Sequence, residues 1–455
     1  MSQKPLLIIP AETKVRELDA KLLLAVVALR KGFDVVVGAL KEMKYLADLL
    51  DRGIFLDKSV AKTKQRWFTH YRNLGHHIAA LDEEGLVYFD AETYRQLRIY
   101  PPSMAEAELF FAWGPDQAEV IAPAVGNLAE RIRITGNPRF DLLRPELRNI
   151  YAEDVATLRQ QHGRIILINT SFAFSNRADG TAALRDTFAQ YPISKERPGF
   201  FEGWTAAQAN VMRSFQEMLP QLRQHFPEHT LIIRPHPSER LDVWQDFTAA
   251  MPKTEVIREG NVVPWIQACD ALIHWNCTTA IEAYLLGKPA FAYRKEQPDQ
   301  YEQQLPNTCS FHACSPEELL RLMEQALAGT LDFTPEAAVA RDKALQRHIA
   351  SLEGTLAAEQ MIDDLLPLAR SFVRKRSLPE TGLRTLKRTW RAVLDQVSPE
   401  RHSRDKYVAV KFPDTSLDEV QARVAVIAEC LQYPTEISVR QAGWNCFSLT
   451  AAERQ

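Results

Sequence analysis

An Arg-Pro-His-Pro run follows the apolar stretch Leu231–Ile233 directly, and it contains the residue best suited to phosphate chemistry. Proline cannot continue a central strand, so Pro235 and Pro237 end the predicted strand and stiffen its exit. They hold His236 at the carboxyl end of that strand, where an imidazole can donate a hydrogen bond or a charge to a phosphate. We expect Arg234, His236 and Pro237 to bind the ligand. The alternative is a turn histidine without a ligand.

A second group follows the next apolar run, Ala271–Trp275. A strand is expected to stop at Asn276, and a helix to start at Thr278 or Thr279. Helix N-termini carry unpaired N–H groups and a partial positive charge, so they attract phosphate. We expect Asn276, both threonines and Glu282, one turn later, to contact the same ligand. Ordinary helix capping by these residues is the alternative.

Three consecutive acids, Asp82, Glu83 and Glu84, follow the predicted strand His77–Leu81 and precede Gly85. Glycosyl transfer needs a carboxylate, either as a base for the acceptor hydroxyl or as a nucleophile on the anomeric carbon. We take Glu83 and Glu84 as candidates for this role. A solvated acidic turn is the alternative.

Two further loops are expected to reach the ligand, and each follows the first strand of a predicted domain. The first has charges of both signs, without a glycine-rich fingerprint, and acceptor binding is expected of Glu12, Lys14, Arg16 and Glu17. The alternative for these four is a helix first turn with i,i+4 pairs. In the second loop, donor binding is expected of Asn169, Ser171 and Asn176.

These loops must be positioned by two successive series of short apolar runs with helical segments between them. The β-α-β order predicts parallel sheets covered by helices, hence an α/β protein with two Rossmann-like domains facing a cleft. We expect an N-terminal acceptor domain over 1–150, a nucleotide-sugar domain over 151–370, and over 371–455 a basic helical segment with a small β-α-β-β extension. The strands of that extension are predicted at Tyr407–Phe412, Glu436–Arg440 and Asn445–Leu449.

Bulk properties exclude several classes of protein. The 455 residues carry a formal net charge of -3, which argues against a nucleic-acid partner. No stretch approaches the roughly 20 apolar residues of a membrane span, and no His or Cys cluster has metal spacing. We therefore expect a cytoplasmic protein without a metal. The basic stretch 370–391 predicts peripheral contact with the inner face of the cytoplasmic membrane, or else a solvated helix face.

Four stretches together resemble the bacterial surface carbohydrate biosynthesis protein family: Ala11–Leu24, Asp82–Asp90, Thr135–Leu143 and Asn169–Asn176. The resemblance covers roughly residues 5–370. A second one is to CMP-ulosonate transferases of the GT-B fold, meaning sialyltransferases and Kdo transferases. It rests on Glu83-Glu84-Gly85, His236-Pro237 and Thr278-Thr279, in that order, although the hydroxyl pair here is Thr-Thr instead of a serine pair.

By that resemblance, Glu83 or Glu84 acts on the acceptor hydroxyl, His236 helps the CMP phosphate to leave, and Thr278 and Thr279 hold it. The implied activity is transfer of Kdo or a related ulosonic acid from a CMP-sugar to a lipid-linked or polysaccharide acceptor of capsule or lipopolysaccharide, without a cofactor. Two alternatives stay open: an enzyme like the CDP-alditol glycerophosphotransferases, and a non-catalytic scaffold of polysaccharide assembly. UDP-sugar 2-epimerases share the fold, but their array of acids and histidines has no counterpart in the sequence.

Overall fold

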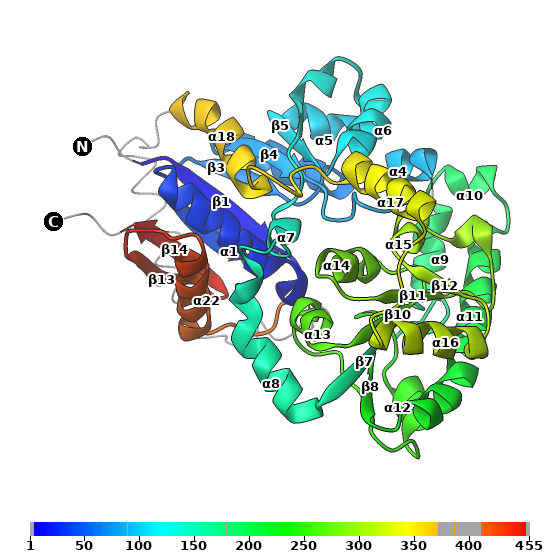
Figure 1. Ribbon diagram of the computed structural model, residues 1–455. Coiled ribbons are helices and arrows are strands. Elements are labelled where there is room, and N and C mark those ends of the chain that lie inside the picture. Colours follow the sequence, from blue (N-terminus) through cyan, green and yellow to red (C-terminus); the bar gives the residue numbers. More distant parts are fainter. Residues whose placement is uncertain (1–3, 89, 179, 372–385, 387–410, 452–455) are drawn as a thin grey trace. The chain divides into compact units, whose positions relative to one another are not determined.

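The computed structural model describes residues 4–88, 90–178, 180–371, 386 and 411–451 (Figure 1). Contacts divide the chain into two compact units. Unit 1 comprises Met1–Leu86, Arg98–Ile150 and Arg347–Gln455, and unit 2 comprises Val87–Leu97 and Tyr151–Gln346. Within the described residues, no helix has the length and apolar character needed to cross a membrane.

Unit 1 is built on an eight-stranded sheet with the order β13-β14-β2-β1-β3-β4-β5-β6. The six strands from β2 to β6 in this order pair in parallel, as the repeated β-α-β pattern predicts. Their bounds are β1 Leu6–Ala11, β2 Asp34–Ala39, β3 Ile54–Asp57, β4 His77–Leu81, β5 Leu109–Ala112 and β6 Ile132–Ile134.

Helix α1, Lys14–Arg30, is the central helix of unit 1, and nearly all of its residues from Leu18 to Leu29 are buried. It contacts β2, α7, α18 and α22, so it has little solvated surface (Figure 1). It ends where Gly32 adopts a φ of 92°, which only glycine takes readily. The other helices are α2 Leu40–Leu46, α3 Gln65–Asn73, α5 Pro101–Glu106, α6 Pro115–Val125, α7 Pro138–Asp141, α18 Ala357–Arg370 and α22 Leu417–Cys430, with short 3-10 turns at Lys62–Lys64, Gly126–Arg131 and Arg148–Tyr151.

The predicted C-terminal extension belongs to the sheet of unit 1. Strand β14, Cys446–Ala451, pairs antiparallel with β2 and with β13, Ile437–Gly443. Helix α18 also packs in this unit, against α1 and β3, although the sequence placed it with the second domain. Most of the predicted strand at Tyr407–Phe412 lies outside the described residues, and Lys411 and Phe412 are not in a strand. Apart from Arg370, Ser371 and Leu386, the basic stretch 370–391 also lies outside them.

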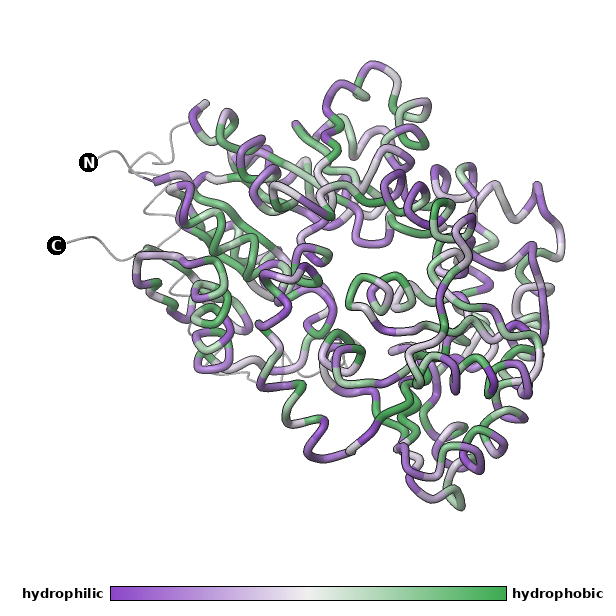
Figure 2. The backbone as a smooth tube through the Cα atoms, in the orientation of Figure 1, coloured by the Kyte–Doolittle hydropathy of each residue, from purple (hydrophilic) through white to green (hydrophobic). Residues whose placement is uncertain are grey.

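Unit 2 is built on a six-stranded, fully parallel sheet with the order β12-β11-β10-β7-β8-β9. The strands are β7 Arg164–Asn169, β8 His229–Arg234, β9 Thr254–Val256, β10 Ala271–His274, β11 Ala290–Tyr293 and β12 Phe311–Ala313. The central strands are nearly continuous hydrophobic runs, as expected of a sheet covered on both faces (Figure 2).

A long helix, α11 at Phe200–His225, supplies much of the core of unit 2 through Val211, Phe215, Met218 and Leu222. These side chains pack with β7, β8 and β10. The remaining helices are α4 Ala91–Arg98, α8 Ala152–His162, α9 Ala182–Ala189, α10 Ile193–Glu196, α12 Asp242–Thr248, α13 Val262–Ala268, α14 Thr279–Leu285, α15 Gln304–Thr308, α16 Pro316–Leu327 and α17 Pro335–His348, with a 3-10 turn at Asp299–Tyr301.

Candidate functional site

The three donor-binding segments predicted from the sequence leave unit 2 from one edge of its sheet. Asn169, the last residue of β7, is paired in register with Arg234 of β8 on one side and His274 of β10 on the other. Strands lie about 4.8 Å apart, so the three segments start within about 10 Å of one another. We call this the carboxyl edge of unit 2. It brings the His236 and Thr278 segments together, as the sequence predicted.

Side-chain hydrogen bonds tie the three segments to each other. The amide of Asn169 donates to the Thr279 hydroxyl over 3.0 Å, and the Ser171 hydroxyl donates to the carbonyl of Trp275 over 2.7 Å. The Thr170 hydroxyl donates to the carboxylate of Glu239 over 2.9 Å. Both Asn169 and Ser171 therefore position neighbouring segments, whatever else they contact.

Glu239 holds the segment that carries His236, and the sequence analysis missed it. It is completely buried and also accepts hydrogen bonds from the backbone N–H groups of Phe172 (2.9 Å) and His236 (3.1 Å) and from the Trp244 indole (3.2 Å). Burial raises the pKa of its carboxyl. In the sequence it is one of several charges in a loop, and nothing local marks it as buried.

The structure fixes the tautomer of His236. Its side chain is exposed, and its Nδ1 accepts a hydrogen bond from the backbone N–H of Ser238 over 3.1 Å. An accepting Nδ1 carries no proton, so the neutral ring carries its proton on Nε2. His236 therefore lies exposed at the carboxyl edge of unit 2 with its proton on Nε2.

Arg234 has a different role from the predicted phosphate contact. Its guanidinium donates to the carbonyls of residues 257–260 and lies 5.1 Å from the ring of Trp265. Through these contacts the guanidinium of Arg234 holds the loop after β9 in place. The geometry gives no support to direct ligand binding by Arg234. Pro237, in contrast, is exposed next to His236.

The two threonines at the start of α14 make different contacts. Thr279 accepts from Asn169 and donates to the Cys277 sulfur over 3.0 Å, so its hydroxyl is engaged. Thr278, half-buried, makes no side-chain capping hydrogen bond. Glu282, in the first turn, is buried.

Two predicted ligand-binding asparagines brace loops. Asn276 takes a left-handed φ of 55°, and its amide donates to the carbonyl of Tyr301 while accepting from the backbone of Gln303. The amide of Asn176 donates to the carbonyl of Arg240 over 3.1 Å. Both amides thus fix the loops from which the other candidates project.

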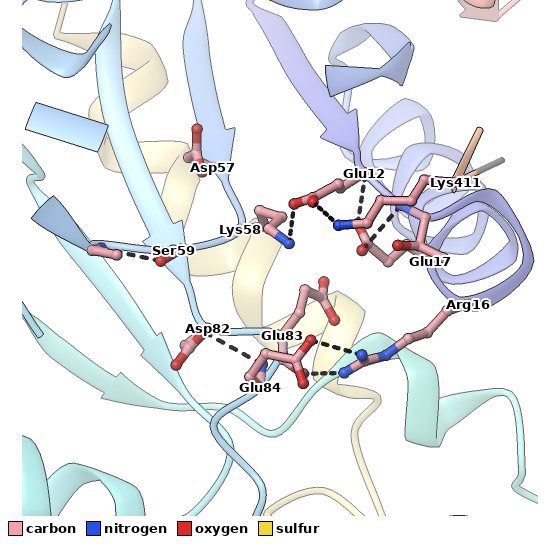
Figure 3. Close-up of polar contacts among 12 residues, drawn as sticks. Glu12, Arg16, Glu17, Asp57, Lys58, Ser59, Asp82, Glu83, Glu84 and Lys411 are labelled. Atoms are coloured by element: carbon pink, nitrogen blue, oxygen red, sulfur yellow. Dashed lines mark hydrogen bonds and ion pairs between the residues drawn. The ribbon is translucent and has the colours of Figure 1, made fainter. Parts of the chain in front are cut away.

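In unit 1, the predicted catalytic acids follow β4 at the carboxyl edge that β1, β3 and β4 share (Figure 3). Glu83 is 2% exposed, and its Oε1 pairs with Nζ of Lys21, which is 3% exposed, over 2.6 Å. Burial pushes the pKa of Glu83 up, but the charges of Lys21, Arg139 and Arg16 outweigh it and lower that pKa. Its Oε2 is buried and has no hydrogen-bond partner among the described residues. Glu83 is therefore ionised and held by a lysine that the sequence analysis missed.

Glu84 points to a different partner. Its carboxylate pairs with Arg16 over 2.7 Å, and the same guanidinium donates to the carbonyl of Glu83 over 2.8 Å (Figure 3). Asp82, the first acid of the run, is buried against Arg98, and its carbonyl accepts from the Trp113 indole. The turn is thus held by ion pairs on both sides.

Glu17 contacts the backbone at the start of helix α1. Its carboxyl accepts from the backbone N–H groups of Glu12 (2.8 Å) and Thr13 (3.2 Å), so the first-turn alternative describes it better than acceptor binding. Burial, together with the negative charge of Glu83, raises the pKa of Glu17. Lys14, another predicted acceptor contact, pairs with Glu419 of α22 over 2.8 Å.

Glu12 lies between two lysines from distant parts of the chain. It pairs with Lys58, which follows β3, and with Lys411, 2.5 Å away, from the C-terminal segment (Figure 3). Burial raises the pKa of Glu12, but the two lysine charges outweigh it and lower that pKa to about 2. Neither lysine was predicted, because nothing in the local sequence connects them with Glu12.

Within the part of the chain that the structure describes, no group of three or more His, Cys, Asp or Glu side chains is arranged to hold a metal ion.

Scans against models of protein families and against curated proteins find no match to this chain. Among solved structures, the wall teichoic acid polymerase TagF with CDPG matches over 81% of this chain and 89% of its own, with 9% identity and a TM-score of 0.50. UDP-GlcNAc 2-epimerase from Neisseria meningitidis bound to UDP-GlcNAc matches over 80% of this chain and 100% of its own, with 14% identity and a TM-score of 0.48. HepE from Anabaena in complex with UDP-glucose has the same coverage and identity and a TM-score of 0.42.

The chain has the GT-B type of fold. At 9% identity the likeness to TagF concerns the fold alone, and it agrees with the two Rossmann-like sheets described above. What the protein does has to be argued from the residues at the two carboxyl edges.

Proposed function

We propose that this protein is a metal-independent glycosyltransferase that moves a sugar, Kdo or a related ulosonic acid, from a CMP-sugar to a glycan or lipid-linked acceptor of bacterial surface polysaccharide. The observation that carries the proposal is the carboxyl edge of unit 2. There His236, with its proton on Nε2, and Thr278 project from two segments that are each tied to the loop after β7. The His236 segment is tied through Glu239 and Thr170, and the Thr278 segment through Asn169 and Ser171. Open parallel sheets bind nucleotides at this edge.

The donor reaction would use His236 as a hydrogen-bond donor. As the bond between the sugar and CMP breaks, negative charge accumulates on the leaving phosphate. A fixed Nε2–H contacting that phosphate would stabilise the charge by a few kcal/mol, with Thr278 as a second donor. A leaving group with one phosphate does not need a divalent cation for this purpose.

On the acceptor side we propose Glu83 as the base. It is ionised, Lys21 holds it at Oε1, and Oε2 is the atom that an acceptor hydroxyl would contact. Glu84, whose carboxylate pairs with Arg16, is the second candidate for this role. Of the predicted acceptor contacts, we keep Glu12, Lys14 and Arg16 for the same side. The basic stretch 370–391 would supply the membrane contact, and the protein would work in the cytoplasm.

The test of donor binding is a CMP titration of wild type and His236→Ala. We expect CMP to raise the melting temperature of the wild type and His236→Ala to weaken CMP binding at least about tenfold, because a charge-assisted hydrogen bond is lost. His225→Ala is the matched control, since His225 lies on α11 and pairs with Glu324. Absence of any response to CMP in the wild type would contradict the proposal.

A second candidate function is transfer of a phosphoalditol from a CDP-alditol. The likeness to TagF, solved with CDPG, favours it, as does the run Arg234-Pro235-His236-Pro237. Incubation with CMP-Kdo, CMP-sialic acid, CDP-glycerol and UDP-sugars separates the two functions. Release of CMP from CDP-glycerol alone would establish the second candidate in place of the first.

A further inference from the structure

Unit 1 exposes aromatic side chains that the proposed transfer does not use. Tyr45, near the end of α2, is 47% exposed, and Trp444, in the turn between β13 and β14, is 43% exposed. Among the described residues, only five large apolar side chains are exposed, and these are two of them. Trp67 of α3 is half-buried, with its ring centroid 6.4 Å from that of Tyr45 and 4.9 Å from Nζ of Lys44. We call Tyr45, Trp67 and Trp444 the aromatic surface of unit 1.

The fold holds Trp444 beside α2. In the same turn, the carbonyl of Asn445 accepts a hydrogen bond over 2.9 Å from the backbone N–H of Ala39, the residue that precedes α2. A Cβ added to Gly443 would lie 3.9 Å from the side chain of Leu46, the last residue of α2. Both ends of α2 are therefore in contact with the turn that carries the Trp444 indole.

The turn itself does not require a tryptophan. Gly443 pairs with Cys446 across the hairpin, so Trp444 and Asn445 form a two-residue loop. Small or polar residues are the usual choice in such loops. Exposing a large ring forgoes the free energy that its burial would contribute, and exposed aromatic rings gathered in one place mark a surface that another molecule covers.

The helices that carry Tyr45 and Trp67 are strongly basic. Together α2 and the segment Lys62–Asn73 contain six Lys and Arg residues and one acid, Glu42, which is buried. The loop from 47 to 53 adds two acids and one Arg, so the excess of positive charge remains. Lys62 and Arg66, one helical turn apart, are both exposed. An occupant of this surface that carries negative charge would match it.

Proteins place aromatic rings and basic side chains together where an anionic lipid bilayer meets water. We propose that the aromatic surface of unit 1, with Lys62 and Arg66, docks on the head groups of anionic membrane lipids. A second copy of the chain, placed face to face on this surface, would bring like charges together. The surface is separate in sequence from the basic stretch 370–391. Only the purpose of the contact, which is to bring a lipid-linked acceptor to unit 1, rests on the proposed transfer.

The experiment measures sedimentation of the full-length protein with vesicles made of equal parts of phosphatidylcholine and phosphatidylglycerol. We expect Tyr45→Ser together with Trp444→Ser to lower partition onto these vesicles at least about tenfold, because the ring area buried in the interface is lost. Lys62→Gln together with Arg66→Gln should have an effect of similar size, because two charges near the anionic surface are lost. The matched control is Ile134→Ser together with Val339→Ser, which removes exposed apolar side chains from β6 and α17 and should leave partition unchanged.

Three results would overturn the docking surface. The first is a wild type that does not sediment with these vesicles. The second is unchanged partition of the Tyr45→Ser, Trp444→Ser variant, which would leave the membrane contact to another part of the chain. The third is an equal loss in the Ile134→Ser, Val339→Ser control, which would mean a general effect of surface hydrophobicity.

Two further comparisons keep the test decisive. If the aromatic variant melts at a lower temperature than the wild type, the Lys62→Gln, Arg66→Gln variant replaces it, and unchanged partition there has the same meaning. If the aromatic variant keeps vesicle binding but loses binding to a soluble acidic polysaccharide, the surface belongs to a glycan and the membrane proposal is wrong. The CMP titration with His236→Ala uses no lipid, so failure of the proposed transfer is distinguishable from failure of the docking surface.

Discussion

At the scale of single residues, the carboxyl edge of unit 2 depends on the buried carboxylate of Glu239. The groups that donate hydrogen bonds to this carboxylate are the hydroxyl of Thr170, two backbone N–H groups and the indole of Trp244. Glu239→Gln keeps the shape but turns one oxygen into an NH₂ group, which must face another donor. We expect a loss of about 1–3 kcal/mol in the free energy of unfolding of unit 2.

Urea unfolding, with hydrogen exchange in β8 to identify the transition of unit 2, measures this loss. Glu336→Gln is the control, since Glu336 is an exposed glutamate on α17. If Glu239→Gln unfolds at the same urea concentration as wild type, the carboxylate does not hold the segment as we describe.

The same residues show how far the sequence leads at this scale. The predicted strand ends placed His236, Glu83 and Thr278 at carboxyl edges, because an apolar run that stops at proline or a polar residue can be recognised from the local sequence. Their partners Lys21 and Glu239 cannot be recognised in this way. An ion pair across 62 residues leaves no periodic pattern, and a buried glutamate has the same letter as an exposed one.

At the scale of elements, the attachment of the C-terminal hairpin depends on a glycine in β2. A Cβ added to Gly38 would lie 2.6 Å from the Cα of Cys446 and even closer to the carbonyl of Asn445. Gly38→Ala must therefore push β14 away from β2. We expect a loss of about 1–3 kcal/mol, as for other overpacked interiors, and faster hydrogen exchange in β14.

Gly443→Ala is the matched control, because an added Cβ there would meet only ordinary contacts at 3.8 and 3.9 Å. Equal exchange rates in β14 for wild type and Gly38→Ala would show that the hairpin does not depend on this close approach.

The pairing of β14 with β2 could not be predicted from the sequence. The sequence identified the strands at Glu436–Arg440 and Asn445–Leu449, with ends within three residues of those of β13 and β14. That the hairpin pairs with β2 could not be predicted, because β2 and β14 are separated by some 400 residues. A hairpin pattern is equally consistent with a separate extension. The parallel pairing of β1 to β6 did follow, since each connection is a local β-α-β unit.

At the scale of the whole molecule, the two units should respond differently to acid. In unit 1, the pKa of Glu12 is lowered to about 2, below the value near 4.3 of an unfolded glutamate. Its contribution to stability is present above about pH 4.3 and is lost as the pH falls through 2. Linkage sets this contribution at about 3 kcal/mol at most.

Carboxyl groups whose pKa is raised in the folded protein do not change the stability between about pH 4 and about pH 2. The pKa of Asp141, whose carboxyl caps α18, is raised by burial to about 7, so its effect falls between pH 7 and about 4. Below about pH 4 it is protonated in both states and contributes nothing further. The same holds for Glu239 in unit 2, where burial also raises the pKa.

We therefore expect unit 1 to lose stability before unit 2 when the pH falls from about 4 to about 2. Hydrogen exchange measured separately in β1 and β7 as a function of pH would follow the two units. Glu12→Gln should flatten the pH dependence of β1 in this window and leave that of β7 unchanged. Equal acid sensitivity of β1 in the wild type and in Glu12→Gln would mean that the two lysines do not hold an ionised Glu12.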